Sequence, residues 1–381
     1  MSKIVIVGAG VSGVYLSILL AIKHHKVIVL EQNSTSLKKL LATGNGRCNL
    51  SNEDMNIKYY QSDDNHLVND IISHFDIDEA MKELGLMTIH LNKLVYPHSE
   101  QAQSVKNILM NRALELGVLF IYEQEVIDIN PYQKIIKSQH QSYHYDDVVL
   151  AMESEAGKLS GINQSRYDIL KKLKLKVIKP TPSLTQMYTK PIYKSWKGIR
   201  VKGTFTLLEN NTIIHKEKGE LLFTDYGVSG IAIMQLSAYV IADYHYQLSI
   251  DFFDEKDNEN LHEYIELQKN KAYNHVYDGL LPLKISSYLE NKGIEDITQL
   301  KDFRLDIVGL RNYETAQVMK GGLSLQEVDH DLQLLSYPHI YAIGEILNVA
   351  GLCGGYNLHF ALSCAKHVSE AIERNSHVKN T

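Results

Sequence analysis

Residues 3–31 read KIVIVGAGVSGVYLSILLAIKHHKVIVLE, and this stretch decides the fold. A β-branched run at 3–7 leads directly into the glycine-rich turn at 8–13, and an apolar stretch follows at 14–22. A second β-branched run, at 27–30, ends on the acid Glu31. The order strand, glycine turn, helix, strand, acid predicts a βαβ unit that binds a dinucleotide.

Each residue type in the turn has a physical reason. Gly8 permits the tight turn out of the strand, Gly10 lets a pyrophosphate approach the backbone, and Gly13 lets the helix pack against the strand. The free amides and the positive dipole end of the helix then face the phosphates. Glu31 can accept hydrogen bonds from the ribose hydroxyls, which favours FAD or NAD over NADP.

The composition sets broad limits on partners and location. The charge-free run at 4–22 could suggest a membrane span or signal sequence, but its three glycines and the immediate return to a strand argue against both. The 381 residues carry a formal net charge of −6, from 39 basic and 45 acidic side chains. We therefore expect a cytoplasmic protein with a small-molecule substrate and no nucleic-acid or membrane partner. The three separated cysteines give no metal-ligand spacing, so no metal site is expected.

Two further glycine-containing stretches suit a flavin cofactor. Residues 43–52 read TGNGRCNLSN, and Lys39 and Arg47 place positive charge beside this loop, which fits a diphosphate or the polar edge of a flavin. A plain surface turn is the alternative for this loop. Near the C-terminus, a strand-like run ends on Gly344-Glu345, where a carboxylate can bond a ribityl hydroxyl. The sequence GGYN at 354–357 then begins an apolar helix, whose positive end would stabilise a reduced flavin.

The middle of the chain has a different pattern of apolar and polar residues. Residues 53–116 look mostly helical with one break at 91–98, and 118–126 have the shape of a further parallel strand. From residue 179, short alternating runs predict an antiparallel sheet, followed by an expected helix at 231–242. The polar stretch at 254–302 reads as a small helical cap. We expect a FAD-binding domain of residues 1–183 and 326–381, a β-sheet domain of 184–251 and 303–325, and a helical cap of 252–302.

These stretches, with GELLFTDYGVSG at 219–230 and GGLSL at 321–325, occur in an order seen in one family. The chain resembles the BaiN/RdsA-like (YhiN-type) NAD(P)/FAD-dependent oxidoreductases, which include an aminoacetone oxidase, over nearly its whole length. The resemblance implies an α/β fold: a Rossmann-like FAD-binding domain of the two-dinucleotide-binding flavoprotein type, with an inserted antiparallel β domain and a small helical cap. It also implies that FAD is bound tightly but not covalently.

The resemblance carries the cofactor-binding residues over position by position, and leaves the catalytic residue unassigned. They are Gly8, Gly10, Val11, Ser12, Gly13, Glu31, Gln32, Lys39, Thr43, Gly44, Arg47, Asn49, Val126, Gly344, Glu345, Gly355, Tyr356 and Asn357. The chain departs from the family at Asn45, where Gly is more usual, and at Asn348, where many members have Asp. The largest departure is Ala151-Met152-Glu153-Ser154, where the family usually has Ala-Thr-Gly-Gly, and it predicts an altered backbone crossing beside FAD.

The favoured function is an FAD-dependent oxidoreductase whose flavin N5 exchanges a hydride with a small organic substrate or with NAD(P)H. No second G-x-G-x-x-G exists, so NAD(P)H would dock transiently. The alternatives are a flavin-dependent RNA-modifying protein and a degenerate member without catalysis. For Cys48 a buried filler is favoured over a reactive thiol, and for His359 a packed role over a catalytic one. Tyr356 could equally stack on a ring or close a turn.

Overall fold

The computed structural model describes residues 1–381 except 158–164, 242–244, 254–257, 270–275, 295–296 and 379–381. The chain forms two compact units: Met1–Thr181 with Val318–Thr381, here the first unit, and Pro182–Gln317, here the barrel unit. The finer boundaries expected at 184, 252, 303 and 326 stay predictions.

A five-stranded parallel sheet forms the centre of the first unit, in the order β20-β11-β1-β2-β7. The βαβ unit predicted at the N-terminus is present, and its helix begins at the glycine turn. Residues Asp147–Leu150 pair in parallel with β1. The bounds are β1 (Lys3–Val7), α1 (Val11–Ile22), β2 (Lys26–Leu30), β7 (Leu119–Ile121), β11 (Asp147–Leu150) and β20 (Ile340–Ala342).

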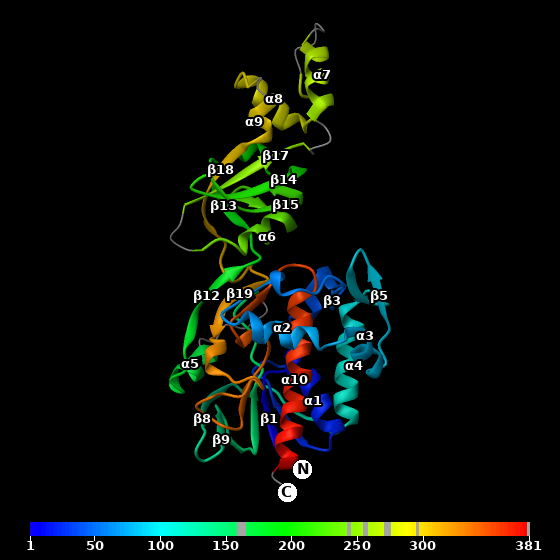
Figure 1. The fold of residues 1–381 in the computed structure, drawn as a ribbon, viewed down its shortest axis with the longest axis vertical. Coiled ribbons are helices and arrows are strands. Elements are labelled where there is room, and N and C mark those ends of the chain that lie inside the picture. Colours follow the sequence, from blue (N-terminus) through cyan, green and yellow to red (C-terminus); the bar gives the residue numbers. More distant parts are fainter. Residues whose placement is uncertain (158–164, 242–244, 254–257, 270–275, 295–296, 379–381) are drawn as a thin grey trace. The chain divides into compact units, whose positions relative to one another are not determined.

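Helices cover this sheet, and α1 and the long C-terminal helix α10 (Tyr356–Val378) lie side by side (Figure 1). The absence of charge in α1 is explained by burial, because nine of its twelve residues are buried. No helix in the described part of the chain is both long and apolar enough to cross a bilayer. The remaining helices of this unit are α2 (Asn65–Ser73), α3 (Ile77–Glu83), α4 (Ala102–Glu115) and α5 (Ser165–Lys172).

Small sheets surround this core, and two local predictions were wrong in part. Residues 53–116 contain three helices, but also strands too short to give a periodic signal. Of 118–126, only Leu119–Ile121 joins the parallel sheet, since β8 begins a separate antiparallel sheet. The strands are β3 (Ser51–Asn52), β4 (Tyr60–Ser62), β5 (Thr88–Leu91), β6 (Leu94–Pro97), β8 (Val126–Asn130), β9 (Ile135–Ser138), β10 (Ser142–His144), β12 (Val177–Ser183), β19 (Val318–Leu323) and β21 (Val349–Gly351).

The barrel unit is a closed antiparallel barrel in the order β13-β16-β15-β14-β17-β18. The antiparallel character was predicted, whereas closure was not. Its strands are β13 (Met187–Lys190), β14 (Arg200–Glu209), β15 (Thr212–Phe223), β16 (Gly227–Ser229), β17 (Tyr246–Asp251) and β18 (Phe303–Leu310). The interior is apolar, and Trp196, the single tryptophan, is fully buried in it.

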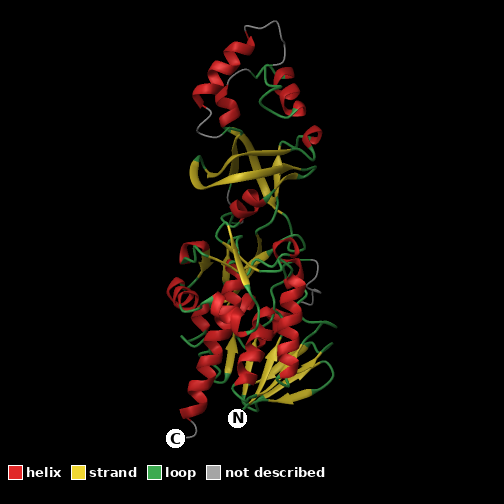
Figure 2. Ribbon diagram, turned by 90° about the vertical axis from the view of Figure 1, so that its right-hand side faces the viewer, coloured by secondary structure: helices red, strands yellow, loops and turns green. Residues whose placement is uncertain are grey.

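Helices of the barrel unit complete its core. The helix expected at 231–242 is α6 (Ile231–Ser237), and residue 242 lies outside the described residues. Between β17 and β18 come α7 (Asn258–Lys269), α8 (Leu283–Asn291) and α9 (Ile297–Lys301), which gather beyond one end of the barrel strands (Figure 2). The Trp196 indole N–H donates to the Lys284 carbonyl at 3.1 Å and so ties α8 to the barrel core.

Candidate functional site

The glycine turn after β1 is too tight for side chains at two positions. A Cβ on Gly13 would stand 2.1 Å from the Gly8 carbonyl oxygen. A Cβ on Gly8, whose φ is +107°, would stand 2.5 Å from the Ala151 carbonyl oxygen. Because both neighbours are backbone atoms, no rotamer change could make room. The sequence requires glycine here for the packing of strand and helix that a dinucleotide-binding turn needs.

Glu31 follows the last residue of β2, and its carboxylate faces the glycine turn. Its Oε2 accepts the Ala9 N–H at 2.8 Å, and its Oε1 accepts the backbone and side-chain N–H groups of Asn33 at 2.8 and 2.7 Å. The residue is only 7% exposed. Three donors therefore fix the carboxylate beside the glycine turn, in the place where ribose hydroxyls are recognised in this type of unit.

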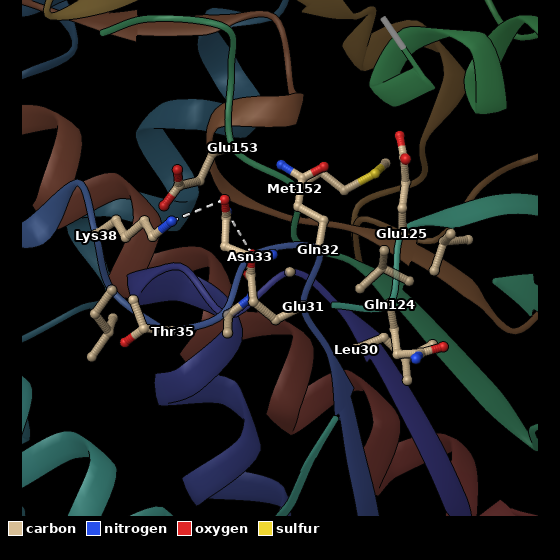
Figure 3. Close-up of a pocket in the computed structure, with 15 residues that line it drawn as sticks. Leu30, Glu31, Gln32, Asn33, Thr35, Lys38, Gln124, Glu125, Met152 and Glu153 are labelled. Atoms are coloured by element: carbon tan, nitrogen blue, oxygen red, sulfur yellow. Dashed lines mark hydrogen bonds between the residues drawn. The ribbon is translucent and has the colours of Figure 1, made fainter. Parts of the chain in front are cut away.

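Glu31 lines a pocket, together with other residues that were predicted to bind the cofactor and that come from separate parts of the sequence. Gly8 and Gln32 line it, and Val126, buried at the start of β8, forms part of its wall. Figure 3 shows Glu31 and Gln32 at the end of one strand, with Met152 and Glu153 on the segment that follows β11. Polar side chains and apolar side chains line the pocket in similar numbers, and this mixture suits the polar sugar and the flat base of a nucleoside. The adenosine part of FAD therefore fits these residues.

The glycine turn at Gly10, where units of this type receive a diphosphate, is approached by a side chain of the protein. Gly10 immediately precedes α1 with extended backbone (φ −75°, ψ −177°), and no side chain caps the helix. The atom nearest to the place of a Gly10 Cβ is Glu153 Oε1, at 3.1 Å. A carboxylate thus lies directly beside the space that glycine leaves open at this position.

Lys39 and Glu345 meet although 306 residues separate them. Lys39 Nζ lies 2.6 Å from Glu345 Oε2, and the same oxygen accepts the Ser154 N–H at 3.0 Å and its hydroxyl at 2.8 Å. Burial alone would raise the pKa of the Glu345 carboxyl, but the Lys39 charge and these hydrogen bonds outweigh it and hold the pKa below the usual range. Glu345 is therefore an anchored, ionised acceptor.

The turn that carries Glu345 also contacts the N-terminus of α1. Gly344 has a φ of +73°, and a Cβ there would stand 2.7 Å from Ser12 Oγ. Both Gly344 and Ser12 are buried. The structure thus brings the predicted residues of the two chain ends, Val11–Gly13 and Gly344–Glu345, together at one helix terminus.

The second glycine loop, Leu40–Gly46, consists of 3-10 turns interrupted by a kink at Thr43, Gly44 and Asn45, and it is fixed by its own contacts. The Thr43 hydroxyl donates to the Leu40 carbonyl at 2.6 Å, and Gly44 adopts a φ of +55°. Asn45 takes a φ of +56° where the family usually has glycine, a conformation that asparagine tolerates better than most residues. Arg47 forms an ion pair with Glu100 and lies over the Tyr96 ring, 4.5 Å from its centroid.

Asn49 and Gly355 connect this loop to the C-terminal segment. With the Asn49 amide oriented to satisfy both of its ends, its oxygen accepts the Gly355 N–H at 3.1 Å and its nitrogen donates to the Ser51 carbonyl at 2.8 Å. A Cβ on Gly355 would stand 2.4 Å from the same Ser51 carbonyl oxygen. Asn357 hydrogen bonds to both backbone groups of Gly351, so its side chain closes the turn before α10.

The aromatic and titratable residues near this turn have structural partners. Tyr356 stacks on Tyr59, with centroids 4.7 Å apart and planes at 26°. His359 bonds Ser51 Oγ at 2.8 Å, and burial lowers its pKa to about 4, so the ring is neutral at pH 7. Cys48 is fully buried, and burial raises the pKa of its thiol to about 12. The predictions that His359 is packed in the interior and that Cys48 is a buried filler are thus confirmed.

A family model described as the HI0933-like protein Rossmann domain matches residues 2–371. The chain belongs to this family. This match confirms the resemblance stated from the sequence. It also confirms the Rossmann-type fold with an added antiparallel domain and, at the level of the family, the oxidoreductase class.

Whole-length relatives of this HI0933-like chain carry two different names. It is 28% identical to the 3-dehydro-bile acid delta(4,6)-reductase of Clostridium scindens, over 95% of this chain and 96% of the relative. It is 25% identical to the ribosomal RNA dihydrouridine synthase of Escherichia coli, over 95% of each chain. Among solved structures, an open flavocytochrome c3 fumarate reductase matches with a TM-score of 0.50 at 11% identity, covering 98% of this chain and 78% of that chain. This last likeness shows the fold alone.

Sequence reasoning about this HI0933-like protein missed the contacts made by Ser154 and Glu153. The signal was present, because both residues stand where the family pattern has glycines, but their positions required the fold. One group of histidine and acidic side chains in the described residues could hold a metal ion: His330, Asp331 and His367. Arg374 already pairs with Asp331 at 2.6 Å, and His330 is exposed, so the expectation of no metal site stays a prediction.

Proposed function

We propose that this protein binds FAD and is an oxidoreductase that moves a hydride between flavin N5 and a small organic substrate or NAD(P)H. One observation carries the proposal: a glycine turn that cannot accept side chains stands directly beside a buried Glu31, whose Oε2 accepts the Ala9 N–H at 2.8 Å. This combination is the recognition element for the adenosine and diphosphate of a dinucleotide. Membership of a family with a reductase among its relatives supports the redox chemistry.

The chain's own residues have distinct parts in this proposal. Glu31 would accept the adenosine ribose hydroxyls, and Val126 would face the adenine from the pocket wall. The first amides of α1 would receive the diphosphate. Glu345 would accept a ribityl hydroxyl, because Lys39 holds its carboxylate ionised and in place. When bound, FAD supplies a hydride acceptor and donor at N5, and the protein orients it and its substrate.

A spectroscopic titration tests the cofactor and the electron donor separately. The purified full chain is titrated with FAD and its visible spectrum is recorded. The loaded protein is then mixed anaerobically with NADH and with NADPH. Bleaching of the visible flavin absorption supports reduction by that nucleotide. Oxygen uptake with small amines and no bleaching would identify an oxidase, and failure to bind FAD at any concentration would defeat the proposal.

Modification of RNA is the second candidate, and one cluster in the barrel unit favours it. The Arg311 guanidinium lies 4.5 Å from the centroid of the Tyr226 ring, and Tyr188 meets that ring edge-on at 5.8 Å. Arginine and tyrosine together can stack on unpaired bases. Two curated relatives, from Escherichia coli and Haemophilus influenzae, are named ribosomal RNA dihydrouridine synthases. The net charge of −6 argues the other way.

Filter binding of ribosomal RNA fragments separates the two candidates. Wild type and Tyr226→Ala are compared at low and at physiological salt. Binding that is lost in the variant supports the RNA candidate, because the cluster would then carry base contacts. The small-molecule proposal predicts no retention of RNA by either protein at physiological salt.

A further inference from the structure

The N-terminus of α1 is a place where an anion is expected. The first amides of a helix have no partner within the helix, and they carry the positive end of its dipole. Here no side chain caps the helix at Gly10, and the first turn contains no acidic residue. The negative group that this terminus favours must therefore come from elsewhere: from a ligand or from another segment of the chain.

The chain supplies that group itself. The three heavy atoms nearest to the place of a Gly10 Cβ all belong to Glu153: Oε1 at 3.1 Å, Cγ at 3.3 Å and Cδ at 3.6 Å. This is the side of the glycine on which a diphosphate approaches the backbone. In the close-up of the pocket, Glu153 is drawn on the same side as Lys38, away from Gln124 and Glu125 (Figure 3). A carboxylate thus stands where two phosphate charges would have to be.

The backbone on both sides of Glu153 is held in place. The Ala151 N–H donates to the Val7 carbonyl at 2.9 Å, which fixes the end of β11. Ser154 donates twice to Glu345 Oε2, at 3.0 and 2.8 Å. Displacing the segment as a whole would break these bonds, whereas turning the Glu153 side chain about its own bonds breaks none of them. The carboxylate can therefore leave the diphosphate position while the backbone stays.

We propose that Glu153 is a built-in competitor of the cofactor's diphosphate, and that FAD binds only after this side chain has turned away from Gly10. The inference rests on the proposed function, since it concerns the same dinucleotide site. It makes Glu153 a residue that sets cofactor affinity: the carboxylate opposes FAD by its volume and by its charge. The protein would then hold FAD more weakly than a chain with glycine at this position.

Titrations with ligands that differ only in phosphate test this role. Adenosine, ADP and FAD are titrated by calorimetry into dialysed wild type, E153Q and E153G, with E115Q as a matched control. Glu115 is an exposed carboxylate at the end of α4 that pairs with Arg112, so its removal changes the net charge equally. E153Q removes the charge and keeps the volume, whereas E153G removes both. Far-UV circular dichroism checks that each variant is folded.

We expect the FAD and ADP dissociation constants to fall by about tenfold or more in E153Q, because a like charge a few ångströms from the diphosphate is removed. They should fall further in E153G. Adenosine should bind equally to all four proteins, since it lacks the group with which Glu153 competes. E115Q should match wild type for every ligand.

Three results would overturn the inference. One is an unchanged FAD dissociation constant in both E153Q and E153G. A second is wild type that keeps stoichiometric FAD through dialysis, because the carboxylate would then not oppose the cofactor. A third is an equal gain for adenosine and ADP, which would mean a general opening of the pocket. In these cases FAD still binds and the proposed function stands, whereas absence of FAD binding in every protein would defeat both.

Discussion

Replacing Lys39 with methionine should lower the free energy of unfolding of the first unit by about 1–3 kcal/mol at neutral pH. Lys39 Nζ lies 2.6 Å from Glu345 Oε2, and the two side chains are 16% and 31% exposed. Exposed ion pairs contribute about 0–1 kcal/mol, whereas removing one partner of a buried pair costs about 3–5 kcal/mol. This pair is partly buried, so the expected cost lies between these values.

The cost should also depend on pH in a way that identifies its cause. Burial raises the pKa of the Glu345 carboxyl, but Lys39 and Ser154 outweigh it and leave the pKa below its usual value of 4.5. Stability from a carboxyl with a lowered pKa is present above the usual value and is lost as the pH falls through the folded-state pKa. Without Lys39 that pKa rises. The difference between wild type and K39M should therefore be largest at pH 7 and shrink as the pH falls below 4.5.

Urea unfolding followed by far-UV circular dichroism at pH 7, 4.5 and 3.5 measures this difference. K38M is the matched control, because Lys38 is the next residue and donates to the neutral Asn33 Oδ1 at 3.1 Å. Asn33 does not titrate, so the cost of K38M should change less with pH than the cost of K39M. Equal losses in the two variants at pH 7, or a K39M cost that does not change with pH, would refute the assigned role of the ion pair.

The other predictions concern the turn, the ribose carboxylate and a buried histidine. Gly13→Ala should cost about 3 kcal/mol, because its Cβ would stand 2.1 Å from the Gly8 carbonyl oxygen; thermal unfolding measures this, and an unchanged Tm would contradict it. Glu31→Gln should raise the FAD dissociation constant about tenfold by calorimetry, since one charged acceptor is lost; an unchanged value would remove Glu31 from the site. Burial lowers the pKa of His359 to about 4, so wild type should lose about 1.4 kcal/mol per pH unit below 6.5 down to about pH 4. His359→Gln should remove this slope from urea unfolding curves, and an identical slope in the variant would assign the loss to other groups.

The N-terminal βαβ unit could be predicted almost completely because its determinants are local. Strand, turn and helix follow from the pattern of residues 3–31, and the structure puts them at Lys3–Val7, Val11–Ile22 and Lys26–Leu30. The helix begins three residues earlier than the apolar run suggested, because Val11, Ser12 and Gly13 form its first turn. Local sterics and hydrophobic periodicity are enough for such elements.

Contacts between distant segments could not be predicted from the residues that make them. Lys39 and Glu345 were each assigned to the cofactor, but nothing in either stretch predicts that their side chains pair. The barrel is similar: alternation predicts antiparallel strands, whereas closure depends on β13 pairing with β18, which is far along the chain. Residues 88–97 fold as a hairpin, but each strand has four residues, too few for periodicity to distinguish from a helix end.

At residues 151–154, the departure from the family pattern could be predicted to alter the backbone, but the new side-chain contacts could not be predicted. Loss of the two glycines predicted that the crossing beside the cofactor was altered. It did not predict that Ser154 would hold Glu345 or that Glu153 would lie against Gly10. Side-chain direction after a strand depends on which backbone groups are already bonded, and that is a property of the assembled sheet.

The strand order of the first unit governs when this protein can fold during synthesis. The βαβ segment is synthesised before the barrel unit, whereas its neighbours in the first unit, the edge strand β20 and the helix α10 that packs on α1, are synthesised after it. The barrel unit is one continuous segment, and its ends meet where the Gln317 N–H donates to the Leu184 carbonyl at 3.3 Å. The barrel can therefore complete its own hydrogen bonds on the nascent chain before β20 and α10, which pack around the βαβ segment, have been synthesised. The βαβ segment is thus synthesised before the barrel but completes its contacts after it.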